Sequence, residues 1–338
     1  MSTLSYKLFR DLKNTLGQVL AIAFVIAGGA ATFIMSLSTL DSLQATRHLY
    51  YQQYNFADIF ASVKRAPENV GRRIAEIPGV SALQTRVVAP VKLAISGFDD
   101  PVKGQIISVP DSDEPRLNKL YLRQGRQLDP NRSDEVLMNE AIAKAHNFSL
   151  GDSIQAVIKG RLKTLTIVGI VLSPETIYQL APGAIVPDFK RYGVLWMSRR
   201  FLEASFEMEG AFNDVVVSLS AGASADDVID RINLMLAPYG GIDAYGREWQ
   251  TSHRFLNEEF KQLKQMSTIF SSIFLGVAAF LLNVVIKRLI DTQREQIAVL
   301  KAFGYRNREV AFHYIAYVLC IVSIGLCLGA GAGIWLGK

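Results

Sequence analysis

The side chains that could carry out acid–base catalysis are scattered along this chain. Its four histidines lie far apart in sequence, at His48, His146, His253 and His313. Its carboxylate clusters fall in polar, turn-like stretches, at 99–100, 111–114 and 134–135. General acid–base catalysis needs a group held within hydrogen-bond reach of one substrate atom, and solvated turns do not predict such a position. We interpret the histidines as surface or packing residues and the carboxylates as solvated loop charge.

Motifs for nucleophilic, metal-dependent and phosphoryl chemistry are absent from the sequence. It contains no Gly-x-x-x-x-Gly-Lys-Ser/Thr phosphate loop, no His-Glu-x-x-His and no Gly-x-Ser-x-Gly. The two cysteines, Cys320 and Cys327, lie together in one apolar stretch, so the rest of the chain has no disulfide. We therefore expect a protein that is not an enzyme and has no catalytic, cofactor-binding or metal-binding residues.

The apolar residues concentrate in three stretches. The chain has 338 residues, 50% of them hydrophobic and 20% charged, and its mean hydropathy of +0.20 is high for a soluble protein. Asp, Glu, Lys and Arg are absent from 16–40, 269–286 and 311–337. Because a helix needs about 20 apolar residues to cross a hydrocarbon core about 30 Å thick, each stretch is a candidate membrane span. This pattern disfavours the alternative of three buried helices in a soluble protein.

The first apolar stretch also has features of a cleaved signal peptide. Lys7, Arg10 and Lys13 precede it, and small residues occupy 27–30. Its apolar run is longer than the roughly 7–15 residues of a signal core, which favours a retained anchor. We expect transmembrane helices at 16–40, 266–288 and 311–337.

Basic residues beside the spans predict the orientation of the chain. Six of them fill the loop between the second and third spans: Lys287, Arg288, Arg294, Lys301, Arg306 and Arg308. Lys and Arg in short loops stay on the cytoplasmic side, so segments 1–15 and 289–310 are expected inside and 41–265 outside. The sequence pI near 9.1 then partly reflects topology and does not indicate nucleic-acid binding. We expect a multi-pass protein of the cell inner (cytoplasmic) membrane whose large domain lies on the periplasmic side.

The outer segment has an α+β pattern in which a similar strand–helix unit occurs twice. A strand at 56–63, a helix at 67–77 and a strand region at 83–95 predict a strand–helix–strand unit over about 50–96. A similar unit over about 205–256 begins with a strand at 214–219. Its helix is capped by Ser224 with Asp227 three positions on, and three apolar residues share one face: Val228, Ile232 and Met235. We expect the two units to pair in one layer.

The middle of the outer segment, about 97–204, is predicted to be an inserted, strand-rich lobe. Its strands include 154–158 and the β-branched run 162–171, joined by a turn at 159–161. Further on, 257–266 alternates charged and apolar residues at helical spacing and continues into the second span. This continuity suggests a helical stalk that joins the outer domain to the membrane. A helix that begins at the membrane interface, with a solvated charged end, explains the pattern equally well.

The loop between the second and third spans is predicted to form a short amphipathic helix. Ile297, Leu300 and Phe303 make an apolar stripe, and Gly304 can end the helix. Such a helix can lie on anionic membrane lipid or present its face to a cytoplasmic partner.

Glycines recur every fourth residue in the third span, at Gly325, Gly329, Gly333 and Gly337. The spacing leaves one groove of the helix without side chains, so another helix can approach closely. The first span offers a mate with small residues at the same spacing: Ala23, Ala27 and Ala31. A second subunit could equally fill the groove.

The run 293–304, Gln-Arg-Glu-Gln-Ile-Ala-Val-Leu-Lys-Ala-Phe-Gly, resembles the cytoplasmic loop of FtsX-like permeases of ABC transporters, the MacB and LolC type. The segments 134–139, 151–154 and 166–170 are similar to recurring strands and turns of the MacB-like periplasmic core of that family. The resemblance covers nearly the whole chain, and the order of its motifs is more specific than any single one.

The resemblance implies a permease subunit that couples ATP hydrolysis in a separate cytoplasmic ABC ATPase to motion of the outer domain. ATP would act only through that partner. Further implied partners are a second permease subunit or half, in a dimer, and an adaptor of the membrane-fusion type. The implied ATPase-coupling residues are Arg294, Glu295, Gln296, Ile297, Leu300, Lys301, Phe303, Gly304 and Tyr305. The family usually has a fourth span, so we expect this chain to be a fragment or a split half.

Two functions remain open at this stage. One is export or extrusion of a hydrophobic or lipid-linked substrate. The other is a signalling or scaffolding subunit that regulates an extracytoplasmic enzyme without transport. No motif in the sequence identifies a substrate.

Overall fold

A computed structural model describes residues 3–111 and 115–337 of the chain. The chain divides into two compact units. The helical unit comprises Met1–Thr46 and Glu259–Lys338, and the sheet unit comprises Arg47–Glu258.

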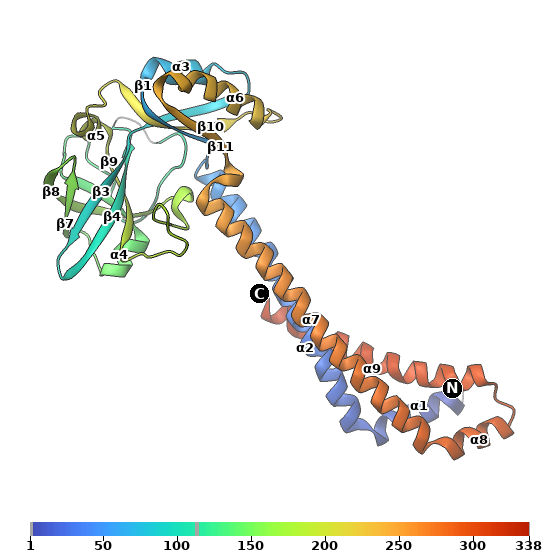
Figure 1. Ribbon diagram of the computed structural model, residues 1–338. Coiled ribbons are helices and arrows are strands. Elements are labelled where there is room, and N and C mark those ends of the chain that lie inside the picture. Colours follow the sequence, from blue (N-terminus) through green and yellow to red (C-terminus); the bar gives the residue numbers. More distant parts are fainter. Residues whose placement is uncertain (1–2, 112–114, 338) are drawn as a thin grey trace. The chain divides into compact units, whose positions relative to one another are not determined.

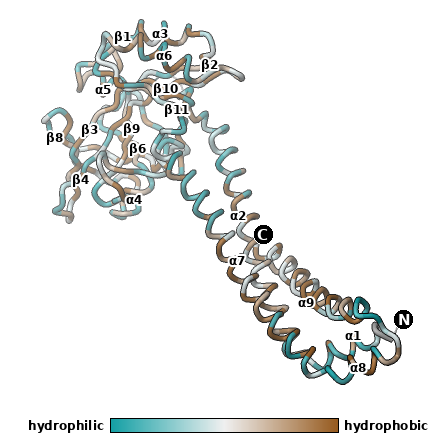
Figure 2. Tube along the Cα trace, turned by 45° about the vertical axis from the view of Figure 1, so that its right-hand side comes forward, coloured by the Kyte–Doolittle hydropathy of each residue, from teal (hydrophilic) through white to brown (hydrophobic). Residues whose placement is uncertain are grey.

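Among the described residues, five helices form the helical unit, whose arrangement Figure 1 shows. They are α1 (Thr3–Asn14), α2 (Leu16–Gln53), α7 (Thr251–Thr292), α8 (Arg294–Ala302) and α9 (Asn307–Leu336). Within the described residues, α2, α7 and α9 are long and apolar enough to cross a membrane, and Figure 2 shows their hydrophobic residues running along the helices. They contain the three spans that the sequence predicts.

Two of these helices continue past the predicted spans. Helix α2 extends to Gln53, and α7 begins at Thr251, well before the apolar stretch at 269–286. The polar segment 257–266 is therefore part of one unbroken helix, as the stalk interpretation requires. The chain passes from one unit to the other only within α2 and α7.

The sheet unit contains a four-stranded sheet in the order β11-β1-β10-β2, with every neighbouring pair antiparallel. Its strands are β1 (Ile59–Pro67), β2 (Val80–Arg86), β10 (Ala211–Leu219) and β11 (Gly241–Gly246). Helices α3 (Glu68–Ala75) and α6 (Ala225–Leu236) pack on it around a core that includes Ile59, Ile74 and Phe212. The order places both strand–helix–strand units in one layer.

The local chemistry of α6 matches its sequence pattern. The hydroxyl of Ser224 accepts a hydrogen bond from the backbone N–H of Asp227 at 3.3 Å, which caps the first turn. Val228 and Ile232 are buried, but the third buried position is Leu236, and Met235 is only half-buried. Met235 nevertheless packs against the same core as Val228 and Ile232, so the predicted face is confirmed and Leu236 extends it.

The second sheet has the order β5-β8-β6-β9-β4-β3-β7, and β7 also pairs with β8. Its strands are β3 (Val88–Ile95), β4 (Phe98–Val109), β5 (Tyr121–Gly125), β6 (Glu135–Asn139), β7 (Ser153–Ile158), β8 (Arg161–Leu172) and β9 (Tyr192–Ser198). The extra pairing closes six strands into a ring and leaves β5 outside it. Closure removes open strand edges, which are prone to unwanted pairing.

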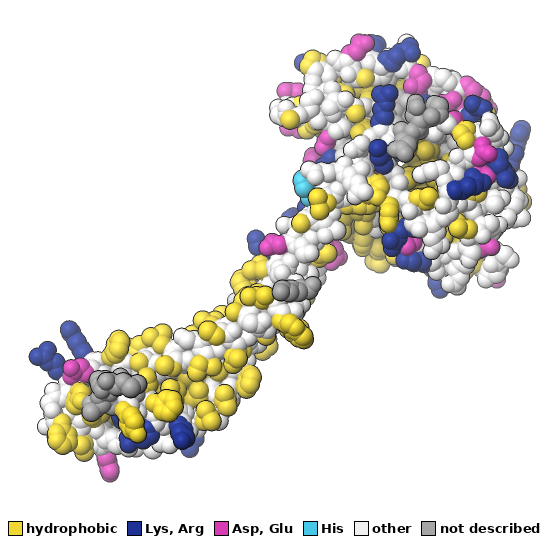
Figure 3. Space-filling view, turned by 180° about the vertical axis from the view of Figure 1, so that it is seen from behind, with side chains coloured by type: hydrophobic (Ala, Val, Ile, Leu, Met, Phe, Trp, Pro, Cys, Tyr) yellow, Lys and Arg dark blue, Asp and Glu magenta, His cyan; other side chains and the backbone are white. Residues whose placement is uncertain are grey.

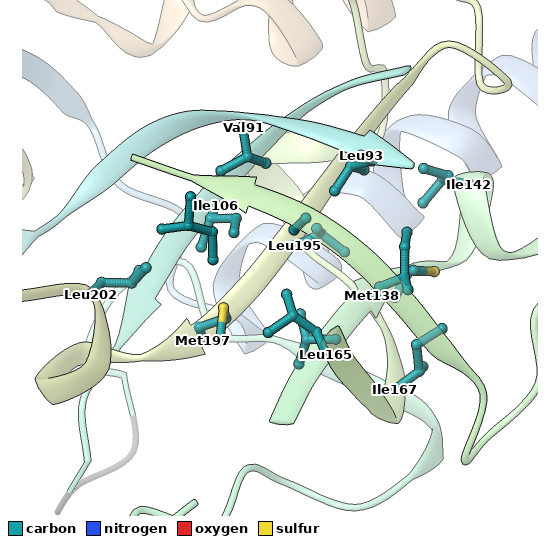
Figure 4. Close-up of a cluster of buried hydrophobic side chains, with 14 of the residues drawn as sticks. Val91, Leu93, Ile106, Met138, Ile142, Leu165, Ile167, Leu195, Met197 and Leu202 are labelled. Atoms are coloured by element: carbon teal, nitrogen blue, oxygen red, sulfur yellow. The ribbon is translucent and has the colours of Figure 1, made fainter. Parts of the chain in front are cut away.

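Short helices complete the sheet unit: α4 (Glu140–His146), α5 (Arg199–Phe206), η1 (Pro174–Thr176), η2 (Ala237–Tyr239) and η3 (Arg247–Trp249). Inside the ring, Ile106, Leu165 and Leu195 meet in a buried hydrophobic cluster that Leu202 of α5 joins (Figure 4). The neighbouring residues on the other face of the strands, such as Ile107 and Trp196, are also buried. Strands β6 and β9 therefore bury both faces, whereas β3 and β7 alternate buried with more exposed residues and β5 is mostly exposed.

The turn predicted at 159–161 is a two-residue hairpin loop. Lys159 and Gly160 both have positive φ, 47° and 80°, as the type I′ turn between antiparallel strands requires. Arg161 already belongs to β8 and pairs with Ile158.

The strand region expected at 83–95 is strand except at Val87, but the prediction missed that it is divided between the two sheets. It is two strands, because β2 ends at Arg86 in the four-stranded sheet and β3 begins at Val88 in the closed sheet. At the crossing, the side chain of Asn213 bonds both backbone groups of Val88, accepting from its N–H at 2.8 Å and donating to its carbonyl at 2.7 Å. These bonds replace the sheet pairing that the switch interrupts. The inserted lobe therefore begins near Val88, not near residue 97.

A buried ion cluster lies beside this crossing. The guanidinium of Arg86 binds both oxygens of Glu175, at 2.6 and 2.9 Å, and one oxygen of Asp214 at 2.6 Å. Burial raises the pKa of the Asp214 carboxyl, and the positive charge of Arg86 opposes that shift. Arg86 thus joins β2, β10 and the η1 turn by charge-assisted hydrogen bonds.

We predict that Arg86→Met lowers the free energy of unfolding by about 3–5 kcal/mol, because two buried carboxylates lose their counter-ion. A carboxyl whose pKa is raised in the folded state is destabilising above that pKa, so the loss should be small near pH 4 and grow toward pH 7. Thermal unfolding of the detergent-solubilised chain measures both effects. In the matched control, Arg191→Met, an exposed arginine loses its bonds to Asp100 and Asp188, and the unfolding temperature should barely change. A pH-independent loss at Arg86 would contradict the electrostatic explanation.

The orientation predicted from the basic residues can be tested at exposed positions in the two units. Asp226, at the start of α6, and Arg306, before α9, are both exposed. A cysteine at Asp226 should react with a membrane-impermeant maleimide in intact cells, and a cysteine at Arg306 should react only after permeabilisation. The reverse labelling pattern would show that the topology is inverted.

Candidate functional site

The break between α7 and α8 and the end of α8 have well-defined local causes. Gln293 leaves the helical conformation with φ −95° and ψ 15° and separates the two helices. At the other end, Gly304 has φ 92°, its N–H bonds the carbonyl of Lys301, and the N–H of Tyr305 bonds that of Leu300. This pair of bonds is a Schellman motif, for which glycine in the left-handed region is the usual residue.

The predicted coupling residues separate into two groups on α8 and the following turn. Six are exposed: Arg294, Glu295, Gln296, Lys301, Phe303 and Gly304. Three are half-buried: Ile297, Leu300 and Tyr305.

The residues of the apolar stripe, Ile297, Leu300 and Phe303, therefore differ in exposure. Ile297 packs against the buried cluster of the helical unit, whereas Phe303 is 81% exposed. Val299, which the stripe did not include, is 55% exposed. Periodicity identifies the apolar residues of a short helix, but it cannot show which of them the fold buries.

A groove of about 450 Å³ lies between α1 and α8. Its lining residues are Tyr6, Lys7, Arg10, Glu295, Gln296, Val299 and Leu300. Both views place α1 and α8 at the same end of the helical unit (Figures 1 and 2). In the space-filling view, hydrophobic side chains cover the helical unit and Lys and Arg side chains gather at its end (Figure 3). The sequence identified α1 only as a basic flank, so its part in this groove was missed.

The structure brings the glycines of the third span against the small residues of the first. A Cβ built on Gly325, Gly329 or Gly333 would lie 2.7–2.9 Å from a backbone carbonyl oxygen of α2. The three carbonyls belong to Ala23, Ala27 and Ala31 in turn. Both partners advance by four residues together, so α2 and α9 run parallel.

The fourth glycine and one glycine of α2 extend this packing. Gly337 meets Ser38 of α2 rather than an alanine, at 3.1 Å from a built Cβ. On another side of α2, a Cβ on Gly29 would lie 2.8 Å from the Cβ of Phe274 in α7. The hydroxyl of Ser271 also donates to the carbonyl of Gly29 at 3.2 Å. Small residues thus let α2 pack closely against both other long helices, as expected in a bilayer.

Two family models match the chain. Residues 13–234 match the MacB-like periplasmic core domain, and residues 268–338 match the FtsX-like permease C-terminal domain. An uncharacterized ABC transporter permease protein of Mycobacterium tuberculosis is 23% identical over 214 residues, which cover 61% of this chain and 22% of that protein. The chain therefore spans about a fifth of the length of this relative.

Two solved structures are also similar to the chain. The extracellular domain of the ABC-type transporter YknZ from Gram-positive bacteria has a TM-score of 0.37 and 12% identity, over 56% of this chain and 98% of that one. The periplasmic region of MacB from Actinobacillus actinomycetemcomitans has a TM-score of 0.37 and 10% identity, over 62% of this chain and 95% of that one.

Fold and sequence together define a membrane protein with three candidate spans and a large α+β domain outside the cytoplasm. The chain belongs to the family of ABC transporter permeases with an FtsX-like C-terminal region and a MacB-like periplasmic core.

The glycine contacts predict that a larger side chain destabilises the chain only at certain positions of α9. Gly329→Leu or Gly333→Leu should lower the stability of the chain in detergent by about 1–3 kcal/mol or more, because the side chain collides with the backbone of α2. Gly331→Leu is a matched control on the same helix, since a built Cβ there meets nothing within 4 Å. Leu328→Ala, at a half-exposed position off the stripe, should also do little. Resistance to unfolding by sodium dodecyl sulfate measures the difference, and equal losses at Gly329 and Gly331 would contradict a special contact.

Proposed function

We propose that this chain is a permease subunit of the cell inner membrane that couples ATP hydrolysis by a separate cytoplasmic ATPase to motion of its extracytoplasmic domain. The motion would drive export or extrusion of a hydrophobic or lipid-linked substrate. Family membership supports the coarser part of this proposal. The single observation that carries the finer part is the exposed apolar surface of α8 beside the groove with α1.

The position of α8 suits a docking element. It lies in the short segment between two candidate spans, and its exposed surface combines Val299 and Phe303 with the charges of Arg294, Glu295 and Lys301. Apolar anchors surrounded by charged residues are typical of the few side chains that supply most of the binding energy at protein interfaces. In this proposal, ATP acts only through the partner that docks here.

The route for the motion is the pair of continuous helices. Because α2 and α7 continue from the helical unit into the sheet unit without a break, a displacement of their membrane-embedded parts need not pass through a flexible linker. The close contacts of α2 with α9 and α7 support concerted movement of the three helices. We further propose that the exposed apolar side chains of α7, including Ile269, Phe270 and Phe280, face membrane lipid or a second permease subunit.

The docking surface gives a direct prediction. Phe303→Asp and Val299→Asp should each weaken ATPase association by about 2 kcal/mol, roughly thirtyfold in affinity, because burial of an apolar side chain is lost. Ile297 is a poor test of docking, since its replacement would disturb the core. Copurification of the ATPase subunit with the tagged chain measures the effect. Leu234→Asp, the same kind of change at a 75% exposed position of α6, is the matched control. Unchanged copurification with both α8 variants would overturn the docking role.

A further inference from the structure

A buried polar network holds α1 against the rest of the helical unit. The ammonium of Lys7 donates to a carboxylate oxygen of Asp11 and to the amide oxygen of Gln293, both at 2.6 Å. Nε2 of His313 lies 3.2 Å from the same carboxylate oxygen, and the hydroxyl of Tyr314 donates to the amide oxygen of Gln293 at 3.2 Å. The side chains of Lys7 and Asp11 are only 10% and 3% exposed. Three separate elements, α1, α9 and the break before α8, therefore share one set of hydrogen bonds.

Anchoring of α1 to the bundle does not by itself require these polar groups. Leu8 and Leu12 of α1 already pack against the buried apolar cluster of the helical unit. Burying charged groups is unfavourable unless each is paired, so Lys7 and Asp11 need one definite geometry. This required geometry fixes the position of α1 and its register against the neighbouring helices, as buried polar groups do at some helix interfaces.

Gln293 lies at the junction where this geometry can most directly affect the direction of α8. It is the residue between the end of α7 at Thr292 and the start of α8 at Arg294. Its backbone remains bonded on both sides, with its N–H bonding Leu289 and its carbonyl accepting from Ile297. Its side-chain oxygen is held from α1 by Lys7 and from α9 by Tyr314. The direction in which α8 leaves α7 is thus tied to a side chain that two other helices hold.

We propose that α1 is part of the coupling element and that Lys7 is a positioning residue, which sets the orientation of α8 through Gln293 and so shapes the groove presented to the ATPase. This inference rests on the proposed docking function for its biological meaning. The positioning itself can be measured without the ATPase. An α1 that served only as a lipid anchor, through the exposed Tyr6 and Phe9, would not affect α8.

The orientation of α8 can be followed by spin labels on cysteines at Phe9 in α1 and Ala302 in α8, both exposed. Cys320 and Cys327 are replaced by serine, and the full chain is measured in lipid nanodiscs without the ATPase. Lys7→Met and Gln293→Met should each broaden the distance distribution, and the double variant should broaden it no further, because the two residues act through one contact. Gln293→Glu keeps an acceptor oxygen and should retain a narrow distribution. Lys13→Met, the same change at an exposed lysine of α1, is the matched control.

The same variants are then tested for ATPase copurification. Lys7→Met should weaken it roughly tenfold or more, since a hydrogen bond to a charged group is lost, and Lys13→Met should not. Narrow distributions in Lys7→Met and Gln293→Met, or additive effects in the double variant, would overturn the positioning role. Broadened distributions with unchanged ATPase binding would uphold the positioning role and overturn the docking function instead. Should Lys7→Met fail to assemble, the comparison of Gln293→Met with Gln293→Glu decides the question.

Discussion

The close contact between α2 and α9 is the constraint on which the helical unit depends. In a bilayer the lipid tails are as apolar as leucine, so helices gain little from hydrophobic burial and associate through close packing and hydrogen bonds. Glycines at 325, 329 and 333 remove the side chains that would otherwise separate α9 from the backbone of α2. On another side of α2, Gly29 allows the same closeness to α7. Helix α2 is thus fixed on two sides by contacts that tolerate almost no added volume.

The sheet unit is held together by a different balance of forces. Its closed sheet surrounds a hydrophobic core, and β6 and β9 are also buried on their other face. The switch of the chain from one sheet to the other, at Val87, is made by side-chain hydrogen bonds and the Arg86 ion cluster rather than by apolar packing alone. Because the chain leaves this unit only through α2 and α7, any signal carried by the backbone must pass through those two helices.

The sequence predicts features that depend on local chemistry better than those that depend on tertiary contact. The spans, the Ser224 cap and the turn at Lys159 follow from composition, periodicity and residue conformational preference. The strand switch at Val87 could not be seen, because Val87 and Val88 continue the strand pattern and no turn residue separates β2 from β3. The exposed side of α8 could not be seen either, because Ile297 and Phe303 are equally hydrophobic and only the packing of α1 and α9 distinguishes them.

Lys7 shows why the network around α1 left no signal in the sequence. Its position in a basic N-terminal segment predicts a solvated charge on the cytoplasmic side, and the Lys7–Asp11 spacing is that of an ordinary surface helix pair. In the folded chain both side chains are buried and paired, whereas Arg10 and Lys13 are exposed. The basic residues beside the candidate spans thus lie in two kinds of environment. Most are exposed, and Lys7 is buried in the network that joins α1 to Gln293, next to the start of α8.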